Sequence, residues 1–167
     1  MSRFLMSAAL ISLASGCESQ GPPDKSVMAT LPVFVPIECV LEAAPNLGPK
    51  TVRLRFVNKG DRTAPILSWL VARDGDLTGE LTNELFEVRM GAKDVHYIGK
   101  LVRRSSTRTD DDYVFVPVSE PLVVVVDLGR FYQMDATGQY DVVYEAYNSV
   151  HDGLVVIKSN AVTLNVK

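Results

Sequence analysis

From residue 32 onward the sequence consists of short β-strand patterns separated by turn signals, with almost no helical period. The segment 51–58 (TVRLRFVN) is the clearest, because the apolar residues Val52, Leu54 and Phe56 alternate with the charged residues Arg53 and Arg55. Successive side chains of a strand point to opposite faces, so one face of this segment is expected to be buried. Similar segments follow or precede it at 33–41, 66–71, 85–90, 95–98, 113–116, 122–128, 140–147, 154–157 and 161–166.

This series of strands and turns predicts an all-β fold, an immunoglobulin-like antiparallel β-sandwich of about 7–9 strands, in residues 32–167. The segment 122–128 (LVVVVDL) has no polar residue before Asp127, which predicts a central strand covered on both sides. Phe56, on the apolar face of its strand, and Trp69, in a short strand, are predicted core residues.

The N-terminus carries a short apolar leader that ends at small residues followed by Cys17. An apolar run at 4–13 and the sequence LASGC are typical of a secretory signal, and the cysteine makes it resemble a bacterial lipoprotein signal. The resemblance implies a signal peptide in residues 1–16, acylation of Cys17 and attachment to a membrane through the N-terminal lipid. The alternative is an ordinary cleaved signal with a chance cysteine.

Residues 17–31 are polar and rich in Gly, Pro and Ser, which predicts a flexible tether. Glu18, and not Asp, follows the cysteine. In enteric-type bacteria this resembles the default pattern of lipoproteins in the outer membrane. We therefore expect a lipid-anchored protein of the bacterial cell envelope, in the outer rather than the inner membrane if the host is Gram-negative.

The net charge and the cysteine count limit the partners and the disulfide bonds that can be expected. A formal net charge of −3 offers no basic footprint for nucleic acid. If Cys17 carries lipid, Cys39 is the one cysteine left and no intrachain disulfide is expected. Cys39 lies in an apolar-rich segment and is predicted to be a small buried hydrophobe. The oligomeric state is left open.

Several short motifs carry a family resemblance. They are VRLRFVNKGDR (52–62), ILSW (66–69), ELFEV (84–88), VHYIGKLVRR (95–104), DDYVFV (111–116), GQYDV (138–142) and SNAVTLNV (159–166). Their order and spacing resemble the non-catalytic N-terminal β-sandwich domain of bacterial metallopeptidases of the deuterolysin and peptidyl-lysine endopeptidase family. The segment 117–121 (PVSEP) departs from that family's Gly-containing turn. The resemblance implies an accessory domain without its peptidase domain.

The family's zinc site needs two histidines one helical turn apart, whereas this sequence has only His96 and His151, 55 residues apart. No catalytic residue, metal site or cofactor is therefore predicted, and both histidines are expected to be structural or surface residues. Asp74, Asp76 and the acidic run 110–112 are interpreted as solvated loops, with calcium binding as the less favoured alternative.

The segments 100–112 and 74–84 are the longest polar connections in an otherwise short-turned domain. Arg103, Arg104 and Arg108 offer forked donors for carboxylates and are the candidate partner-binding residues. The sequence thus predicts a non-catalytic, lipid-anchored protein that binds a deuterolysin-type zinc metallopeptidase and inhibits, chaperones or localises it. The alternatives are a generic envelope binding or structural module without a protease partner, and an orphan fragment of a split peptidase gene.

Overall fold

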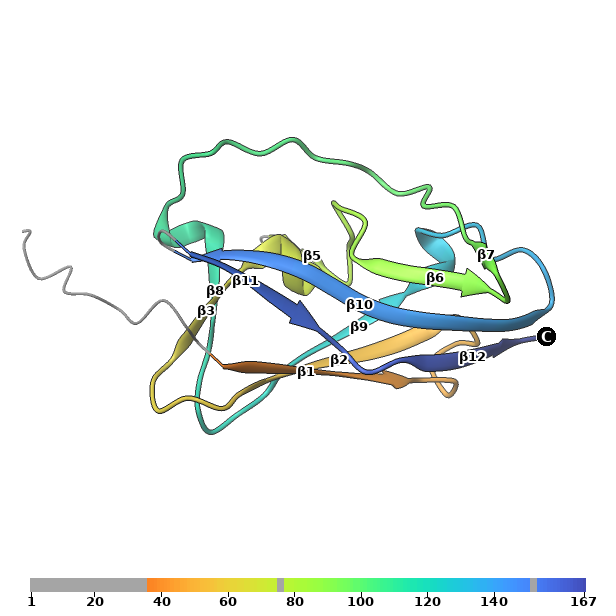
Figure 1. Cartoon of the computed structure of the whole chain (residues 1–167), viewed down its shortest axis with the longest axis horizontal. Coiled ribbons are helices and arrows are strands. Elements are labelled where there is room, and N and C mark those ends of the chain that lie inside the picture. Colours follow the sequence, from red (N-terminus) through yellow and green to blue (C-terminus); the bar gives the residue numbers. More distant parts are fainter. Residues whose placement is uncertain (1–35, 75–76, 151–152) are drawn as a thin grey trace, which may run out of the picture. The chain divides into compact units, whose positions relative to one another are not determined.

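The computed structural model describes residues 36–74, 77–150 and 153–167, which are mostly antiparallel strands (Figure 1). The strands are β1 (Ile37–Ala43), β2 (Thr51–Asn58), β3 (Ala64–Leu67), β4 (Arg73–Asp74), β5 (Leu77–Thr78), β6 (Phe86–Met90), β7 (Lys93–Asp94), β8 (Tyr113–Val116), β9 (Leu122–Asp127), β10 (Gly138–Val150), β11 (Gly153–Lys158) and β12 (Val162–Val166). Short 3-10 helices lie at Ser68–Val71, Asp110–Asp112 and Leu128–Arg130. Among the described residues, no helix is long and apolar enough to cross a membrane.

Two sheets form a sandwich, which confirms the predicted all-β class. One sheet has the order β1-β2-β9, and the other has the order β11-β10-β6-β7 with β12 also paired to β10. This order corresponds to the A-B-E and G-F-C sheets of an immunoglobulin-like sandwich. The hydroxyl of Tyr140, near the start of β10, donates to the carbonyl of Ala136 at 2.7 Å. This contact is the tyrosine corner found at the same place in that fold.

Strand β2 has the predicted alternation. Val52, Leu54 and Phe56 are fully buried, while Arg53 and Arg55 lie on the outer face. Across the sandwich, the ring of Phe56 meets the ring of Tyr144 on β10 edge-on, with centroids 5.6 Å apart. The apolar face of the alternating segment therefore forms the contact between the two sheets.

Strand β9 is an edge strand, so the prediction of a central strand covered on both sides was wrong. Among the described strands β9 pairs only with β2. Val124 and Val126 are buried, but Val123 and Val125 on the other face are 45% and 36% exposed. Four successive valines hide the alternation, because β-branched residues favour a strand whichever face they occupy.

Trp69 is buried as predicted, at 6% exposure, but it lies in the 3-10 helix Ser68–Val71 and not in a strand. Strand β3 pairs with β8 as far as Leu67, and the side-chain amide of Asn148 also bonds the backbone of β3. The N–H of Leu67 donates to Asn148 Oδ1 at 3.2 Å, and Asn148 Nδ2 donates to the carbonyl of Pro65 at 3.1 Å. A buried amide thus ties β3 to β10.

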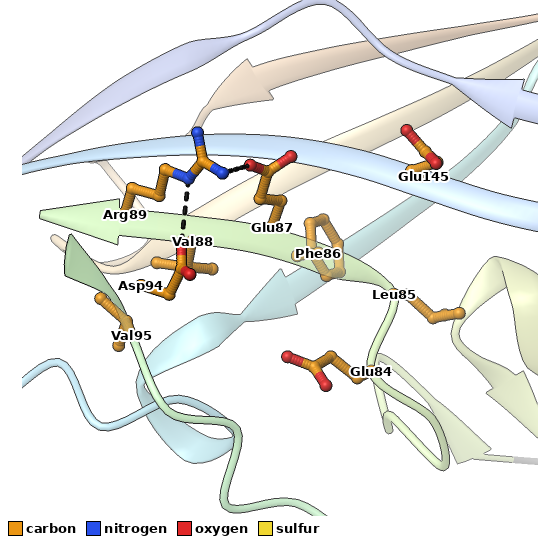
Figure 2. A pocket seen from close by; sticks show the side chains of 9 residues that line it. All are labelled: Glu84, Leu85, Phe86, Glu87, Val88, Arg89, Asp94, Val95 and Glu145. Atoms are coloured by element: carbon orange, nitrogen blue, oxygen red, sulfur yellow. Dashed lines mark hydrogen bonds and ion pairs between the residues drawn. The ribbon is translucent and has the colours of Figure 1, made fainter. Parts of the chain in front are cut away.

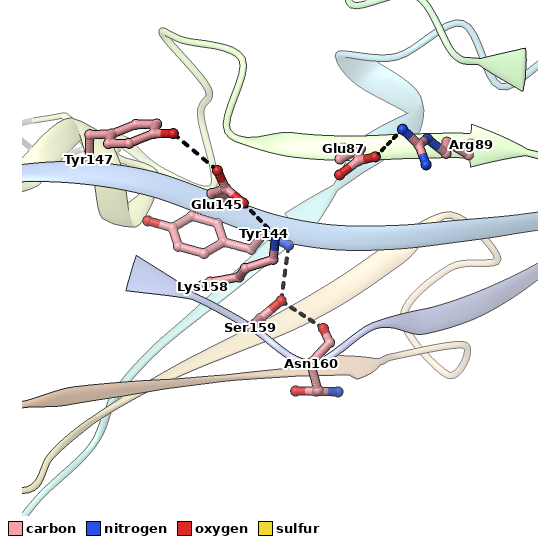
Figure 3. A network of polar contacts seen from close by, with 8 residues as sticks. All are labelled: Glu87, Arg89, Tyr144, Glu145, Tyr147, Lys158, Ser159 and Asn160. Carbon is pink, nitrogen blue, oxygen red and sulfur yellow. Dashed lines mark hydrogen bonds and ion pairs between the residues drawn. The ribbon is translucent and has the colours of Figure 1, made fainter. Parts of the chain in front are cut away.

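Strands β11 and β12 follow one edge of β10 and are separated by a bulge. Lys158 lies opposite Glu145 and Val162 opposite Val142, so three residues of one strand face two of the other. Within the bulge, Asn160 bonds both the N–H and the carbonyl of Leu41 in β1, each at 2.9 Å. Figure 3 shows this residue beside the bulge. Its side chain joins the edges of the two sheets.

Cys39 is the small buried residue that the sequence predicts, with 4% exposure. Burial raises the pKa of its thiol to about 12, so the thiol stays protonated at neutral pH. Its neighbour Tyr144 is also buried, and the hydroxyl of Tyr144 donates to the carbonyl of Leu70 at 2.7 Å. The polar atom of this core tyrosine is therefore satisfied.

Candidate interaction surface

The two long polar segments of the sequence meet in the structure, and we call residues 77–84 and 100–112 the loop pair. The backbone N–H of Val102 donates to the carbonyl of Thr82 at 3.0 Å. The guanidinium of Arg104 donates to Thr82 Oγ1 at 2.8 Å. In Figure 1 the second loop is the long trace that runs from the end of β7 to β8. Contacts between the two segments hold this trace at its first half.

Tyr97 supports the loop pair from below. Its hydroxyl lies 3.3 Å from the carbonyl of Leu81 and 3.0 Å from that of Lys100, so its single O–H is shared between the two loops. A Cβ at Gly99 would come within 2.4 Å of the Tyr97 hydroxyl oxygen, so any larger residue would displace the Tyr97 ring. Burial raises the pKa of Tyr97, and the carboxylate of Glu84 adds to the rise.

Two of the three predicted arginines stack on the buried tryptophan. The guanidinium carbon of Arg104 lies 4.3 Å from the ring centroid of Trp69, and that of Arg108 lies 5.1 Å from it. Arg108 also donates to the carbonyl of Ser105. Each cation–π contact contributes about 0.5–2 kcal/mol, depending on how far the pair is withdrawn from water. Arg104 and Arg108 therefore hold the loop on the core.

Arg103 differs from its two neighbours because it is exposed to solvent. Exposed apolar side chains lie beside it in the chain, with Ile98 at 55%, Leu101 at 74% and Val102 at 40% exposure. These three residues were not predicted from the sequence, although the segment YIGKLV (97–102) mixes apolar residues into a basic stretch. An exposed surface that combines aliphatic groups with a guanidinium suits a protein partner.

The acidic run closes the second loop. The N–H of Thr109 donates to Asp112 Oδ2 at 2.8 Å, which forms a capping box on the 3-10 helix Asp110–Asp112. Among the described residues, no three His, Cys, Asp or Glu side chains lie close enough to hold a metal ion. His96 is exposed. Cys17, Asp76 and His151 lie outside the described residues, as does the side chain of Asp74.

A shallow acidic pocket of about 400 Å³ follows strand β6 (Figure 2). Its lining includes four carboxylates and one guanidinium. The guanidinium of Arg89 is paired with two carboxylates, with Nη2 2.6 Å from Glu87 Oε1 and Nε 2.9 Å from Asp94 Oδ1. On β10, Glu145 Oε2 lies 2.6 Å from Lys158 Nζ. The full lining is Glu84, Leu85, Phe86, Glu87, Val88, Arg89, Asp94, Val95 and Glu145. Glu84 also belongs to the loop pair, so the pocket and the loop pair adjoin.

Comparison with known proteins connects the chain with proteases. No family model matches it. The chain is similar to an extracellular protease of Aeromonas hydrophila, with 29% identity over 120 residues. The similar region takes up 68% of this chain and 33% of the protease, so the chain spans about a third of the length of the curated relative that it matches. A segment related to this sandwich therefore occurs within an extracellular protease.

Proposed function

We propose that this chain is a non-catalytic, lipid-anchored protein of the bacterial cell envelope that binds a zinc metallopeptidase of the deuterolysin type. Binding would inhibit, chaperone or localise the peptidase. The observation that carries the proposal is the similarity to one third of an extracellular protease. The order of sequence motifs that resembles the accessory domain of deuterolysin-family peptidases supports it and suggests the peptidase type.

A domain that packs on a catalytic domain within one chain can also do so between chains. Interfaces between domains of one chain bury about 600–1,500 Å², similar to transient protein complexes. The loop pair offers exposed groups for such packing, with Leu101 and Val102 next to Arg103. Its supports, Trp69 and Tyr97, are buried, so the surface is held in place before a partner arrives.

Binding is tested with the part of the A. hydrophila protease that lies outside the region similar to this chain. We expect saturable binding by the full chain carrying Cys17→Ser. Arg103→Gln should slow association several-fold at low salt, because an exposed charge at an interface rim mainly steers the encounter. Surface plasmon resonance at two salt concentrations measures this effect, and cleavage of casein by an active peptidase shows inhibition or assistance.

The matched control is Arg53→Gln, which removes the same charge from the outer face of the sheet β1-β2-β9. This variant should associate like the wild type. Equal rates for both variants would remove Arg103 from the interface. Absence of binding would contradict the peptidase partner and favour the generic envelope module.

The lipid anchor gives a separate prediction. Cys17→Ser should move the protein from the membrane to the soluble fraction, because each buried methylene of an acyl chain contributes about 0.8 kcal/mol. Fractionation of the native host after a high-salt wash measures this effect. Cys39→Ala, which changes the other cysteine of the chain, should stay with the membrane. A Cys17→Ser protein that remains membrane-bound would contradict the anchor.

A further inference from the structure

We propose that strand β11 pairs antiparallel with β11 of a second copy of this chain, so that the sheet β11-β10-β6-β7 continues across a two-fold axis. This proposal concerns a different part of the molecule from the loop pair and does not depend on the proposed peptidase partner. It is based on the position of β11, its composition and the side chains on the outer face of the sheet.

Strand β11 ends its sheet. It pairs with β10, and no other described strand pairs with its second edge. Soluble proteins usually protect such an edge with charges, prolines or bulges, because its N–H and carbonyl groups attract another strand. The sequence of β11 is GLVVIK, with its single charge at the end, and the bulge at Ser159–Asn160 comes after the strand. Four successive aliphatic residues are left without such protection.

The ladder shows which backbone groups face the second edge. The N–H of Glu145 donates to the carbonyl of Leu85, on the β6 side of β10. Residues alternate along an antiparallel ladder, so Ala146 and Asn148 turn to β11, where they lie opposite Ile157 and Val155. The residues of β11 that alternate with Val155 and Ile157 therefore turn their N–H and carbonyl groups to the outer edge. They are Leu154, Val156 and Lys158.

The outer face of β10 and β11 is apolar at this end. Tyr147 and Val156 are cross-strand neighbours with 56% and 52% exposure, and Leu154 is 67% exposed. Figure 3 shows Tyr147 on β10 and the ion pair between Glu145 and Lys158 beside it. Exposed aliphatic and aromatic groups on adjacent strands of this kind mark an interaction surface.

A second copy fits this edge by symmetry. Antiparallel pairing of a strand with itself is two-fold symmetric and needs no other complementary surface. With Val156 opposite Val156 of the second copy, Leu154 lies opposite its Lys158, so the two ammonium groups stay at opposite ends of the pair. The apolar strip then runs through Tyr147 and Val156 of one copy into the same residues of the other. Such a small interface should give a weak dimer, with a dissociation constant in the micromolar range.

Sedimentation velocity of the full chain carrying Cys17→Ser tests the proposal over about 1–300 μM, the range in which small interfaces associate. We expect a concentration-dependent shift from monomer to dimer. Val156→Pro removes only an N–H that faces the outer edge, so it should spare the ladder with β10 and weaken the dimer at least tenfold. Val156→Lys should weaken it similarly, because two lysines would face each other across the axis.

Val123→Lys is the matched control, since Val123 is an outward valine of similar exposure on β9 of the other sheet. It should dimerise like the wild type, and the melting temperature of every variant is measured to confirm folding. Amide exchange by NMR gives a second readout. Protection of Leu154, Val156 and Lys158 should rise with protein concentration, while that of Val155 and Ile157 should not.

Three results would overturn the proposal. One is a wild-type chain that stays monomeric over the whole range. Another is a dimer that Val156→Lys and Val123→Lys affect equally. The third is protection of Val156 and its two outward-facing neighbours at every concentration, which would mean that residues of the same chain already cover the edge.

Discussion

Phe56→Ala is expected to lower the free energy of unfolding by about 3–5 kcal/mol, the usual cost of removing a large buried aromatic ring. Phe56 is fully buried at the contact between the sheets, and its ring packs edge-on against Tyr144. Tyr144 in turn meets Phe86 at 5.5 Å, so the cavity would open within an aromatic cluster that joins β2, β10 and β6. Domains of this size have about 5–15 kcal/mol of stability in total, so the variant would be partly unfolded or close to it.

Denaturation with guanidinium chloride, followed by circular dichroism, measures the change. The matched control is Val123→Ala, which removes an outward side chain from an adjacent strand of the same sheet. It should change the stability by no more than about 0.5 kcal/mol. An unchanged midpoint for Phe56→Ala would mean that Phe56 does not lie between the sheets.

The sandwich was predictable because most of its strands bury one face. The alternation in residues 51–58 indicates both the strand and the face that it buries, and β2 has the same bounds in the structure. Strand β9 was harder, because valine on both faces gives no alternation to interpret. Trp69 was placed correctly in the core but in the wrong element, since a short apolar run does not distinguish a strand from one turn of 3-10 helix.

The candidate surface was only partly predictable, because its contacts join residues far apart in the sequence. Both loops could be predicted as candidates from their length and charge, and Arg104 and Arg108 were predicted to donate to a partner. Their stacking on Trp69 depends on how the second loop crosses the 3-10 helix, and no local pattern records that path. The acidic pocket was not predicted for the same reason. Glu145 lines it from β10, whereas its other lining residues come from residues 84–95.

The stacking of arginines on Trp69 leads to a second large effect. Trp69→Ala should lower the free energy of unfolding by about 3–5 kcal/mol and should also release the second loop. The stability falls because Trp69 is buried, and the loop is released because Arg104 and Arg108 lose the ring beneath them. Equilibrium denaturation measures the first effect. Limited trypsin digestion measures the second as faster cleavage after Arg103 and its two neighbouring arginines.

Two further variants separate the loop from the core. Trp69→Phe keeps an aromatic ring and most of the buried area, so it should protect the loop better than alanine does. Arg104→Ala leaves the tryptophan in place and should loosen the loop with a much smaller loss of stability, because it removes the stacking and the hydrogen bond to Thr82. Since Trp69 is the single tryptophan of the chain, its fluorescence should shift to longer wavelength when Arg104 no longer covers it. Unchanged trypsin cleavage in both Trp69→Ala and Arg104→Ala would show that this stacking does not hold the loop, and Arg103 would then lack the rigid support that the proposed interface requires.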